Sequence, residues 1–242
     1  MREIHGAREP SDDDYLKQRD LATRDQARYK AAMRKLLGIY RALRKAQGHQ
    51  GWWPAETPFE VAVGAVLAQN TSWRGAAQAV QNLKTAGLLD AARLDRMAVD
   101  RLAKHLVPAG YFNLKAKRLK SLIRFLVERC DGEPAALAAW DLGEARTALL
   151  EVWGLGPETA DSILLYAAGH PVFVVDAYTR RIFSRLGLLD ERLSYDDVRL
   201  FFEKRLPRDL DLYKDFHAQI VRLGSTICRP RPCCEECPIR SD

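Results

Sequence analysis

One turn between two apolar runs organises this chain: Val152-Trp153-Gly154-Leu155-Gly156-Pro157-Glu158-Thr159-Ala160-Asp161, followed fifteen residues later by Asp176. Glycine allows a tight turn that exposes backbone N–H groups, and proline suits the first position of a new helix. A helix N-terminus behind a glycine turn is a ready site for an anion such as phosphate. The stretch therefore predicts a helix–turn–helix corner that can hold a phosphate, although such corners are also common packing devices.

Helical patterns account for most of the remaining chain. The only strand-like run, Val172-Phe173-Val174-Val175, is too isolated to pair, and Thr57 with Glu60 has the spacing of a capping box. We therefore predict an all-α fold. The apolar spacing predicts one helix after Trp73 and others at about 27–47, 58–69, 90–95, 98–106, 114–129, 134–138, 143–152, 157–168, 177–186, 194–204 and 209–223.

The charge of the chain fits a polyanionic partner. The formal net charge of the 242 residues is +6, and residues 101–129 carry eight Lys or Arg against the single acid Glu128. A solvated helix face would explain the basic stretch equally well. No run of eighteen apolar residues occurs and the N-terminus is charged, so we expect a soluble, cytoplasmic protein with no membrane partner.

Five segments, in order over about residues 35–237, resemble the endonuclease III superfamily of helix-hairpin-helix DNA glycosylases. The turn with Val174-Val175-Asp176-Ala177-Tyr178 looks like that family's hairpin and catalytic aspartate. Ala68-Gln69-Asn70-Thr71 and 110–116 resemble its two DNA-probing loops. The resemblance implies two helical domains, 57–165 with the hairpin and 31–56 plus 166–242 with the cysteines, and DNA between them. Residues 1–30 would be a charged tail that is partly disordered or an exposed helix.

The resemblance assigns roles in base removal to four residues. Asp176 would stabilise the positive charge that develops on the sugar, and it would orient or deprotonate the attacking water. Gln69, Tyr111 and Asn113 would probe the duplex or fill the gap left by a flipped nucleotide. The structural alternatives are an N-cap for Asp176, a hydrogen-bonding helix end for Gln69 and a half-buried core aromatic for Tyr111.

The phosphate grip implied by the hairpin combines backbone and side-chain groups. Gly154, Leu155 and Gly156 would supply the turn, while Lys115 and Lys117 would add positive charge. Double-stranded DNA containing damaged bases is the partner this implies, bound by a monomer in the nucleoid of a bacterium or an archaeon. Such contacts would weaken steeply with salt.

Glu158 departs from the pattern of the bifunctional members of the family. Those members carry a lysine near this position, whose amine forms a Schiff base with the sugar. A carboxylate cannot form one, and neither can the neighbouring Pro157 or Thr159. Glu158 therefore predicts a monofunctional enzyme that uses water, unless Lys214 or another lysine acts instead.

Three of the five tryptophans lie near the Gln69 segment. Gly51-Trp52-Trp53-Pro54 and 69–73, which ends in Trp73, look like the 3-methyladenine DNA glycosylase III branch of the superfamily. There, aromatic residues stack on the flipped base, and an electron-rich indole suits a positively charged alkylated purine. The alternative is that the tryptophans pack the junction between domains.

Four cysteines crowd into ten residues near the C-terminus, where the family carries an iron–sulfur cluster. Cys228, Cys234 and Cys237 approximate three of its four ligands, and the fourth would lie a few residues beyond Cys237. Cys233 is a substitute with awkward geometry, since it adjoins Cys234. A [4Fe-4S] cluster, zinc and no metal all remain possible at this point.

The sequence thus predicts a base-excision-repair DNA glycosylase that removes an alkylated purine such as 3-methyladenine. One alternative is an endonuclease III-like glycosylase and AP lyase acting on oxidised pyrimidines. Another is a damaged-DNA-binding protein without catalysis. A plain interaction scaffold explains neither Asp176 nor the cysteines.

Overall fold

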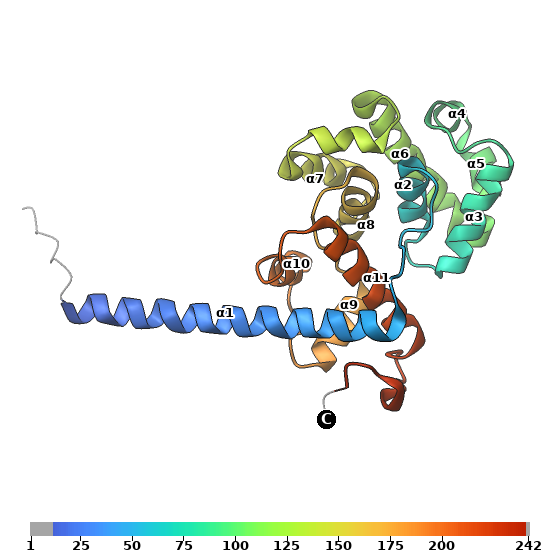
Figure 1. Ribbon diagram of the computed structural model, residues 1–242. Helices are drawn as coiled ribbons and strands as arrows, with labels where there is room; N and C mark the ends of the chain where they lie inside the picture. The colour runs from blue at the N-terminus through green and yellow to red at the C-terminus, as the bar shows by residue number, and fades with distance from the viewer. Residues whose placement is uncertain (1–11, 241–242) are drawn as a thin grey trace, which may run out of the picture.

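The chain folds into helices joined by short turns (Figure 1), as seen in a computed structural model that describes residues 12–240. No β-strand occurs among these residues, so the predicted all-α fold is confirmed. None of the helices in this range combines the length and apolarity that crossing a bilayer requires. In chain order the elements are α1 (Asp12–Gln47), α2 (Pro58–Leu67), α3 (Trp73–Thr85), α4 (Ala91–Arg96), α5 (Val99–His105), η1 (Val107–Ala109), α6 (Phe112–Cys130), η2 (Pro134–Ala139), α7 (Leu142–Glu151), α8 (Pro157–Ser162), η3 (Ile163–Ala168), α9 (Ala177–Arg185), α10 (Tyr195–Glu203), α11 (Leu210–Thr226) and η4 (Cys234–Glu236).

The first helix is longer than the sequence predicts. It was expected to begin near residue 27, but α1 begins at Asp12, inside the stretch interpreted as a tail. Residues 12–26 mix five Asp with Leu, Lys, Arg, Gln and Ala, which favour helix, and their helical conformation agrees with the alternative expectation of a helix in this stretch. Residues 1–11 of the expected tail lie outside the described part of the chain.

Helix α2 is the centre of one group of helices. Every residue from Phe59 to Leu67 except Glu60 is buried, because α2 packs against α3, α6 and η3. Thr57 caps the helix by accepting a hydrogen bond from the Glu60 N–H. The Glu60 carboxylate reaches back to the Glu56 N–H instead of the Thr57 N–H, so only half of the predicted capping box forms.

Helix α11 is the centre of the second group. It packs against α1, α9 and η3, and its buried face adds Phe216 to a cluster of aromatic rings. Phe173, from the extended run 172–175, stacks on Phe202 with ring centroids 4.1 Å apart. The side chains of this run are therefore part of the hydrophobic core, consistent with the expectation that the run pairs with no strand.

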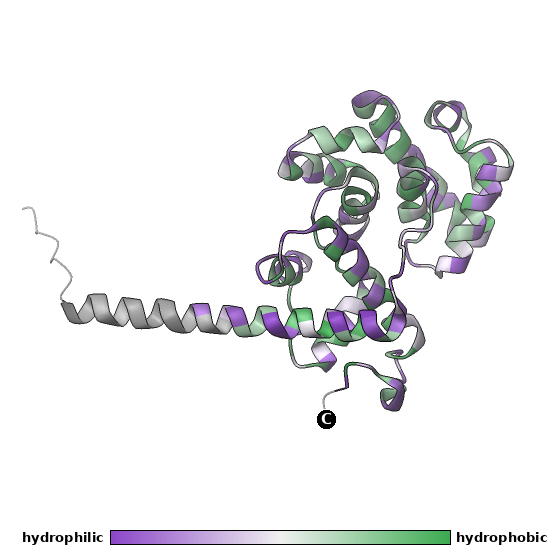
Figure 2. Ribbon diagram, in the orientation of Figure 1, coloured by the Kyte–Doolittle hydropathy of each residue, from purple (hydrophilic) through white to green (hydrophobic). Residues whose placement is uncertain are grey.

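Apolar residues gather between the helices, while charged residues alternate with apolar ones along the described part of α1 (Figure 2). The element η3 contacts both α2 and α11, so it joins the two groups. The predicted domain boundary at residue 165 falls within η3. This places the residues that follow α8 between the two groups of helices, where the candidate site lies.

Candidate active site

The glycine turn packs against Arg118 of α6 on one side and is exposed to solvent on the other. Gly154 adopts φ +89°, and a side chain there would overlap Arg118 of α6, so both the backbone angle and the close approach require glycine. Trp153 is 57% exposed, and Gly156 is exposed at the N-terminus of α8. The Leu155 N–H already donates to the Val152 carbonyl, and its side chain is buried. Leu155 is thus a packing residue, which leaves Gly154 and Gly156 as the candidates for an anion contact.

Gln69 lies at the end of α2 and is tied to this turn. Its amide nitrogen donates to the Gly154 carbonyl at 3.1 Å and to the Thr159 hydroxyl at 2.9 Å. Its amide oxygen accepts from the Arg118 guanidinium at 2.6 Å. The side chain is half-buried and serves as the helix-end hydrogen-bonder that the structural alternative describes. To insert into DNA, it would have to exchange all three bonds.

The second predicted probing loop presents its side chains to solvent. Tyr111 is 72% exposed and holds the left-handed backbone angle φ +45°, and Asn113 is exposed in the first turn of α6. The interpretation of Tyr111 as a half-buried core aromatic is therefore wrong. Asn70, next to Gln69, has φ +50° as well. Such angles cost a non-glycine residue of order 1 kcal/mol and often mark functional loops.

Lys115 does not contribute a surface charge, contrary to the prediction. It is only 1% exposed, and its ammonium donates at 2.7 Å to the carbonyls of Leu67 and Ala109. Burial, with a smaller effect of the Arg118 charge, lowers the pKa of Lys115 to about 8. The lysine therefore pins α6 to the ends of α2 and η1, whereas Lys117 is exposed as expected.

Asp176 caps the N-terminus of α9 with one carboxylate oxygen, and its second oxygen takes no part in the cap. Its Oδ1 accepts from the N–H and hydroxyl of Thr179, at 2.7 and 2.8 Å, which begins α9 with a capping box. Its Oδ2 lies 3.7 Å from Nε2 of His217. Burial alone would raise the pKa of Asp176, but His217 and the Thr179 donors outweigh it and hold that pKa below its ordinary value. A fixed, ionised carboxylate results.

Glu158 lies in the first turn of α8, within the electrostatic field of Asp176. Its side chain keeps more than a third of its surface in solvent, yet the surrounding protein partly desolvates it. This desolvation, followed by the negative charge of Asp176, raises the pKa of Glu158 to about 7, against a smaller opposing effect of His217. The position therefore carries a carboxyl group that gains and loses a proton near neutral pH, and no amine.

The three predicted tryptophans come together. The ring centroids of Trp52, Trp53 and Trp73 lie 4.7–5.4 Å from one another, and Tyr166 of η3 lies 5.5 Å from Trp53. Trp52, Trp53 and Tyr166 line a cavity of about 250 Å³ together with Lys214 of α11, whereas Trp73 packs on the other two indoles and is not part of the lining. The full lining is Trp52, Trp53, Ala55, Glu56, Thr57, Pro58, Val61, Tyr166 and Lys214. Both interpretations therefore fit Trp52 and Trp53, which pack on each other and also line the cavity, whereas the structure shows only packing for Trp73.

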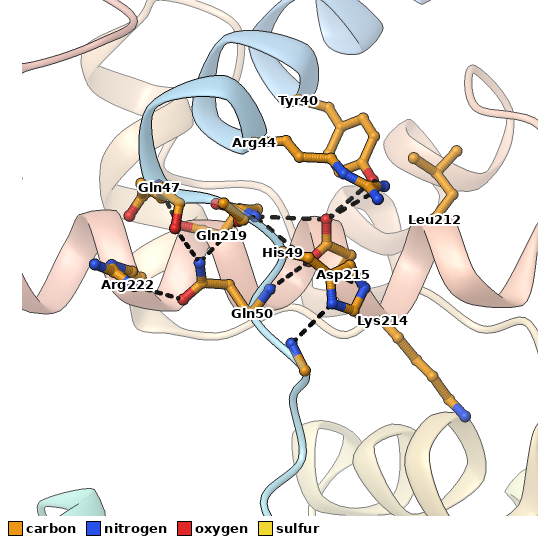
Figure 3. Close-up of polar contacts among 12 residues, drawn as sticks. Tyr40, Arg44, Gln47, His49, Gln50, Leu212, Lys214, Asp215, Gln219 and Arg222 are labelled. Carbon is orange, nitrogen blue, oxygen red and sulfur yellow. Dashed lines mark hydrogen bonds and ion pairs between the residues drawn. The ribbon is translucent and has the colours of Figure 1, made fainter.

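A polar cluster around Asp215 holds the tryptophan loop in place (Figure 3). This buried carboxylate accepts from the Tyr40 hydroxyl of α1 at 3.0 Å and from the Gln50 N–H at 3.1 Å. Gln219 donates to the Gly48 carbonyl at 2.6 Å. Lys214 points away from the cluster (Figure 3). The sequence reasoning missed this cluster, although two polar residues four apart on the apolar face of α11 are a signal for it.

His217 and Tyr166 were also missed by the sequence reasoning. Both side chains are buried, and the Tyr166 oxygen lies 2.7 Å from Nδ1 of His217. The two residues are 51 positions apart, so no local spacing predicts their contact.

The C-terminal cysteines offer thiol ligands suited to a metal, but they do not form a complete set of ligands. Arg185 donates to the sulfur of Cys228 at 3.3 Å and Arg229 to that of Cys233 at 3.7 Å. However, no three His, Cys, Asp or Glu side chains within residues 12–240 gather as metal ligands would. The cysteines are therefore the right kind of ligand for a cluster, but their side chains are not arranged around one point.

Comparison with known proteins agrees with this geometry. Residues 63–208 match the family described as HhH-GPD superfamily base excision DNA repair protein. The putative DNA repair glycosylase MJ1434 of Methanocaldococcus jannaschii is 48% identical over 203 residues, which cover 84% of this chain and 92% of that protein. Endonuclease III of Thermotoga maritima is 28% identical, over 76% of this chain and 81% of its own length.

Solved structures give the same picture. H. pylori 3-methyladenine DNA glycosylase (MagIII), bound to 1,N6-ethenoadenine, superimposes with a TM-score of 0.70 at 29% identity, covering 80% of this chain and 97% of that one. A non-covalent endonuclease III–DNA complex also gives a TM-score of 0.70, at 19% identity over 84% of this chain and 90% of that one. The latter likeness concerns the fold alone.

Proposed function

This chain belongs to the HhH-GPD superfamily of base excision DNA repair proteins and is a DNA glycosylase, and we propose that it is monofunctional and removes alkylated purines such as 3-methyladenine. The observation that carries the proposal is the pairing of a fixed carboxylate, Asp176, with a carboxyl group at Glu158 where a lyase needs an amine.

The proposed reaction breaks the bond between the sugar C1′ and the base nitrogen. As that bond lengthens, positive charge builds on the sugar, and the ionised Asp176 stabilises it from close by. Water adds to C1′, gives a proton to Asp176 or to solvent, and leaves an abasic site. The bonding electrons go to the departing base. The step thus consumes only the damaged nucleotide and water, with Asp176 as the participating group of the protein.

The tryptophan cavity is the proposed seat of the flipped base. The face of an indole ring attracts a cationic purine that stacks on it by roughly 1–2 kcal/mol when the purine is desolvated. Lys214 and Glu56 place opposite charges on the cavity wall, so a cation is not simply repelled there. The 29% identical structure that holds an ethenoadenine is that of a 3-methyladenine glycosylase, which supports a purine in this chain as well.

A methylated duplex tests this proposal. Incubating it with the enzyme and separating the released bases by chromatography is expected to yield free 3-methyladenine in excess of other bases. Release of oxidised pyrimidines alone would instead establish the endonuclease III-like alternative. Salt-sensitive binding of abasic DNA without release of any base would establish a binding protein without catalysis.

Borohydride trapping on an abasic duplex separates hydrolysis from lyase chemistry. We expect no covalent adduct with the unaltered enzyme, because Glu158 cannot form a Schiff base. Glu158→Lys is expected to gain an adduct. If the unaltered enzyme is trapped and Lys214→Ala abolishes the trapping, the enzyme is bifunctional and uses the lysine on the cavity wall.

The proposed phosphate contacts involve Gly154, Gly156 and the exposed Lys117, and a matched pair of variants tests them. Lys117→Met is expected to weaken binding to every duplex and to reduce the slope of log affinity against log salt by about 1. Lys115→Met is expected to leave that slope unchanged and to destabilise the fold by about 1–3 kcal/mol, since it orphans two buried carbonyls. Affinity titrations and thermal unfolding measure the two effects; equal salt slopes for both variants would contradict the assignment.

The probing roles of Gln69, Tyr111 and Asn113 belong to the same proposal, with damaged duplex lying between the helix group 57–165 and the group formed by 31–56 and 166–242. The exposed Tyr111 and Trp153 provide apolar surface suited to bases that are pulled out of the stack.

We propose a monomer that works in the cytoplasm, at the nucleoid. Gel filtration with light scattering checks the monomer.

The C-terminal cysteines are proposed to hold a [4Fe-4S] cluster with a structural role. The support is the set of four thiols in ten residues, two of them hydrogen-bonded to arginine. Brown protein with broad absorption near about 400 nm and stoichiometric iron is the expected result. Colourless protein with bound zinc, or with no metal, would contradict it.

A further inference from the structure

His217 lies between the base cavity and the catalytic carboxylate. It is 5% exposed and comes from α11, while Asp176 caps α9 and Tyr166 lies in η3. Its Nδ1 is 2.7 Å from the Tyr166 oxygen, and its Nε2 is 3.7 Å from Oδ2 of Asp176. Nε2 is buried and has no hydrogen-bond partner among the described residues. A buried nitrogen aimed at a carboxylate calls for an explanation.

The hydrogen positions follow from the partners of Tyr166. Its oxygen lies 2.7 Å from His217 Nδ1 and 3.1 Å from the Lys214 carbonyl, which only accepts. If the hydroxyl donates to Nδ1, the neutral ring carries its single proton on Nε2. If the hydroxyl donates to the carbonyl, Nδ1 carries a proton, and a bare Nε2 would then face the carboxylate lone pairs. Repulsion between those lone pairs disfavours that arrangement, so the hydroxyl donates to Nδ1 and the ring proton lies on Nε2.

We propose that His217 is a positioning residue that holds Asp176 ionised and correctly oriented through an N–H on Nε2, and that Tyr166 fixes the tautomer which places the proton there. This inference rests on the proposed function, because it concerns the reactivity of Asp176. The two oxygens of Asp176 divide their tasks. Oδ1 starts α9, and Oδ2 faces the histidine and the site.

The same tyrosine belongs to the base cavity. Its ring lies 5.5 Å from that of Trp53 and lines the cavity together with Lys214, whose carbonyl is the alternative acceptor of its hydroxyl. Tyr166 therefore takes part both in binding the flipped base and in orienting the Asp176 carboxylate. A change in the cavity would therefore reach Asp176 through the Tyr166–His217 hydrogen bond and the 3.7 Å contact of His217 Nε2 with the carboxylate.

Other charged or titratable groups lie on the elements packed around this pair. Glu158 of α8 interacts electrostatically with Asp176 and His217, and Asp215 and Lys214 lie on α11 with the histidine. Arg44 of α1 and His49 each lie 3.8 Å from Asp215. Burial, with the charges of Asp176 and Asp215, raises the pKa of Tyr166 well above its ordinary value. Tyr166 consequently stays a neutral donor throughout the working pH range.

The pH profile of base release tests the positioning role. In His217→Phe the lost donor favours the protonated Asp176, so the midpoint of the acid limb is expected to move upward by about one pH unit. Single-turnover release below the new midpoint falls about tenfold for each unit. His217→Gln, which keeps a donor, should restore part of the shift, and His105→Gln on α5 serves as the control. An unshifted acid limb in a folded His217→Phe protein would overturn the proposal.

Nitrogen NMR of the labelled, unaltered protein tests the tautomer without any reaction. The spectrum is expected to show a protonated Nε2 on His217, and Tyr166→Phe is expected to mix the tautomers. A bare Nε2 in the unaltered protein refutes the inference even if base release is normal. Conversely, a protonated Nε2 in a protein that releases no base would leave the pair intact and overturn the proposed function.

Discussion

Replacing Asp176 by asparagine is expected to slow single-turnover base release by about 10²–10³-fold, the usual effect of losing a group that stabilises transition-state charge. Asparagine is as good an N-cap as aspartate, and its side-chain oxygen can still accept from Thr179. The free energy of unfolding should therefore change by less than about 1 kcal/mol. Affinity for damaged duplex should stay within about twofold, because the carboxylate contacts no phosphate in the proposed complex.

The control for this variant is Asp209→Asn. Asp209 caps α11 in the same manner, accepting from the Leu212 N–H at 2.8 Å, but it lies outside the proposed site. Its substitution should leave base release unchanged. Rapid-quench kinetics, thermal unfolding and a binding titration on the three proteins separate the chemical effect from the capping effect. Full base release by Asp176→Asn would remove the proposed mechanism.

Asp215→Ala is expected to have the largest effect on stability. It leaves the Tyr40 hydroxyl and the partly buried Gln50 N–H without their acceptor, and of the contacts between α11 and the tryptophan loop it removes the one made by Asp215. Breaking such a buried polar network costs on the order of 3 kcal/mol, equivalent to a fall in Tm of roughly 6–12 °C for a chain of this size. Binding of a flipped base should weaken too, because Trp52 follows two residues after Gln50.

Asp211→Ala is the matched control, since Asp211 is exposed on the first turn of the same helix. It should shift Tm by no more than about 2 °C. Differential scanning calorimetry gives the stability, and fluorescence of the clustered tryptophans reports on the loop. A Tm for Asp215→Ala equal to that of the control would show that the cluster is dispensable.

Local patterns in the sequence predicted much of this molecule. Asp176 as a helix cap and the glycine turn each follow from properties of a few adjacent residues, and the structure agrees with both. Lys115 was misjudged because net charge was counted without regard to helical phase. It lies four positions before Leu119 and seven before Leu122, on the buried face of α6, so periodicity held the missing information.

Contacts between distant residues were out of reach. Gln69 bonds to Gly154, 85 positions away, and Tyr40 bonds to Asp215, 175 positions away. Nothing in either neighbourhood specifies its partner, because tertiary hydrogen bonds depend on how whole helices pack. The resemblance to a family suggested candidate functional positions, but it could not reveal which of those side chains already hydrogen-bond within the protein.

The two loops with left-handed non-glycine residues set a limit on engineering this protein for heat resistance. Asn70 and Tyr111 both hold backbone angles that glycine would adopt without strain. A design procedure that scores only folding would replace them with glycine and gain melting temperature. In doing so it would erase the exposed tyrosine ring and loosen the loop beside Gln69. Selection for thermal stability alone therefore favours glycine at these two positions, whereas the proposed search for damaged bases requires the residues that are present.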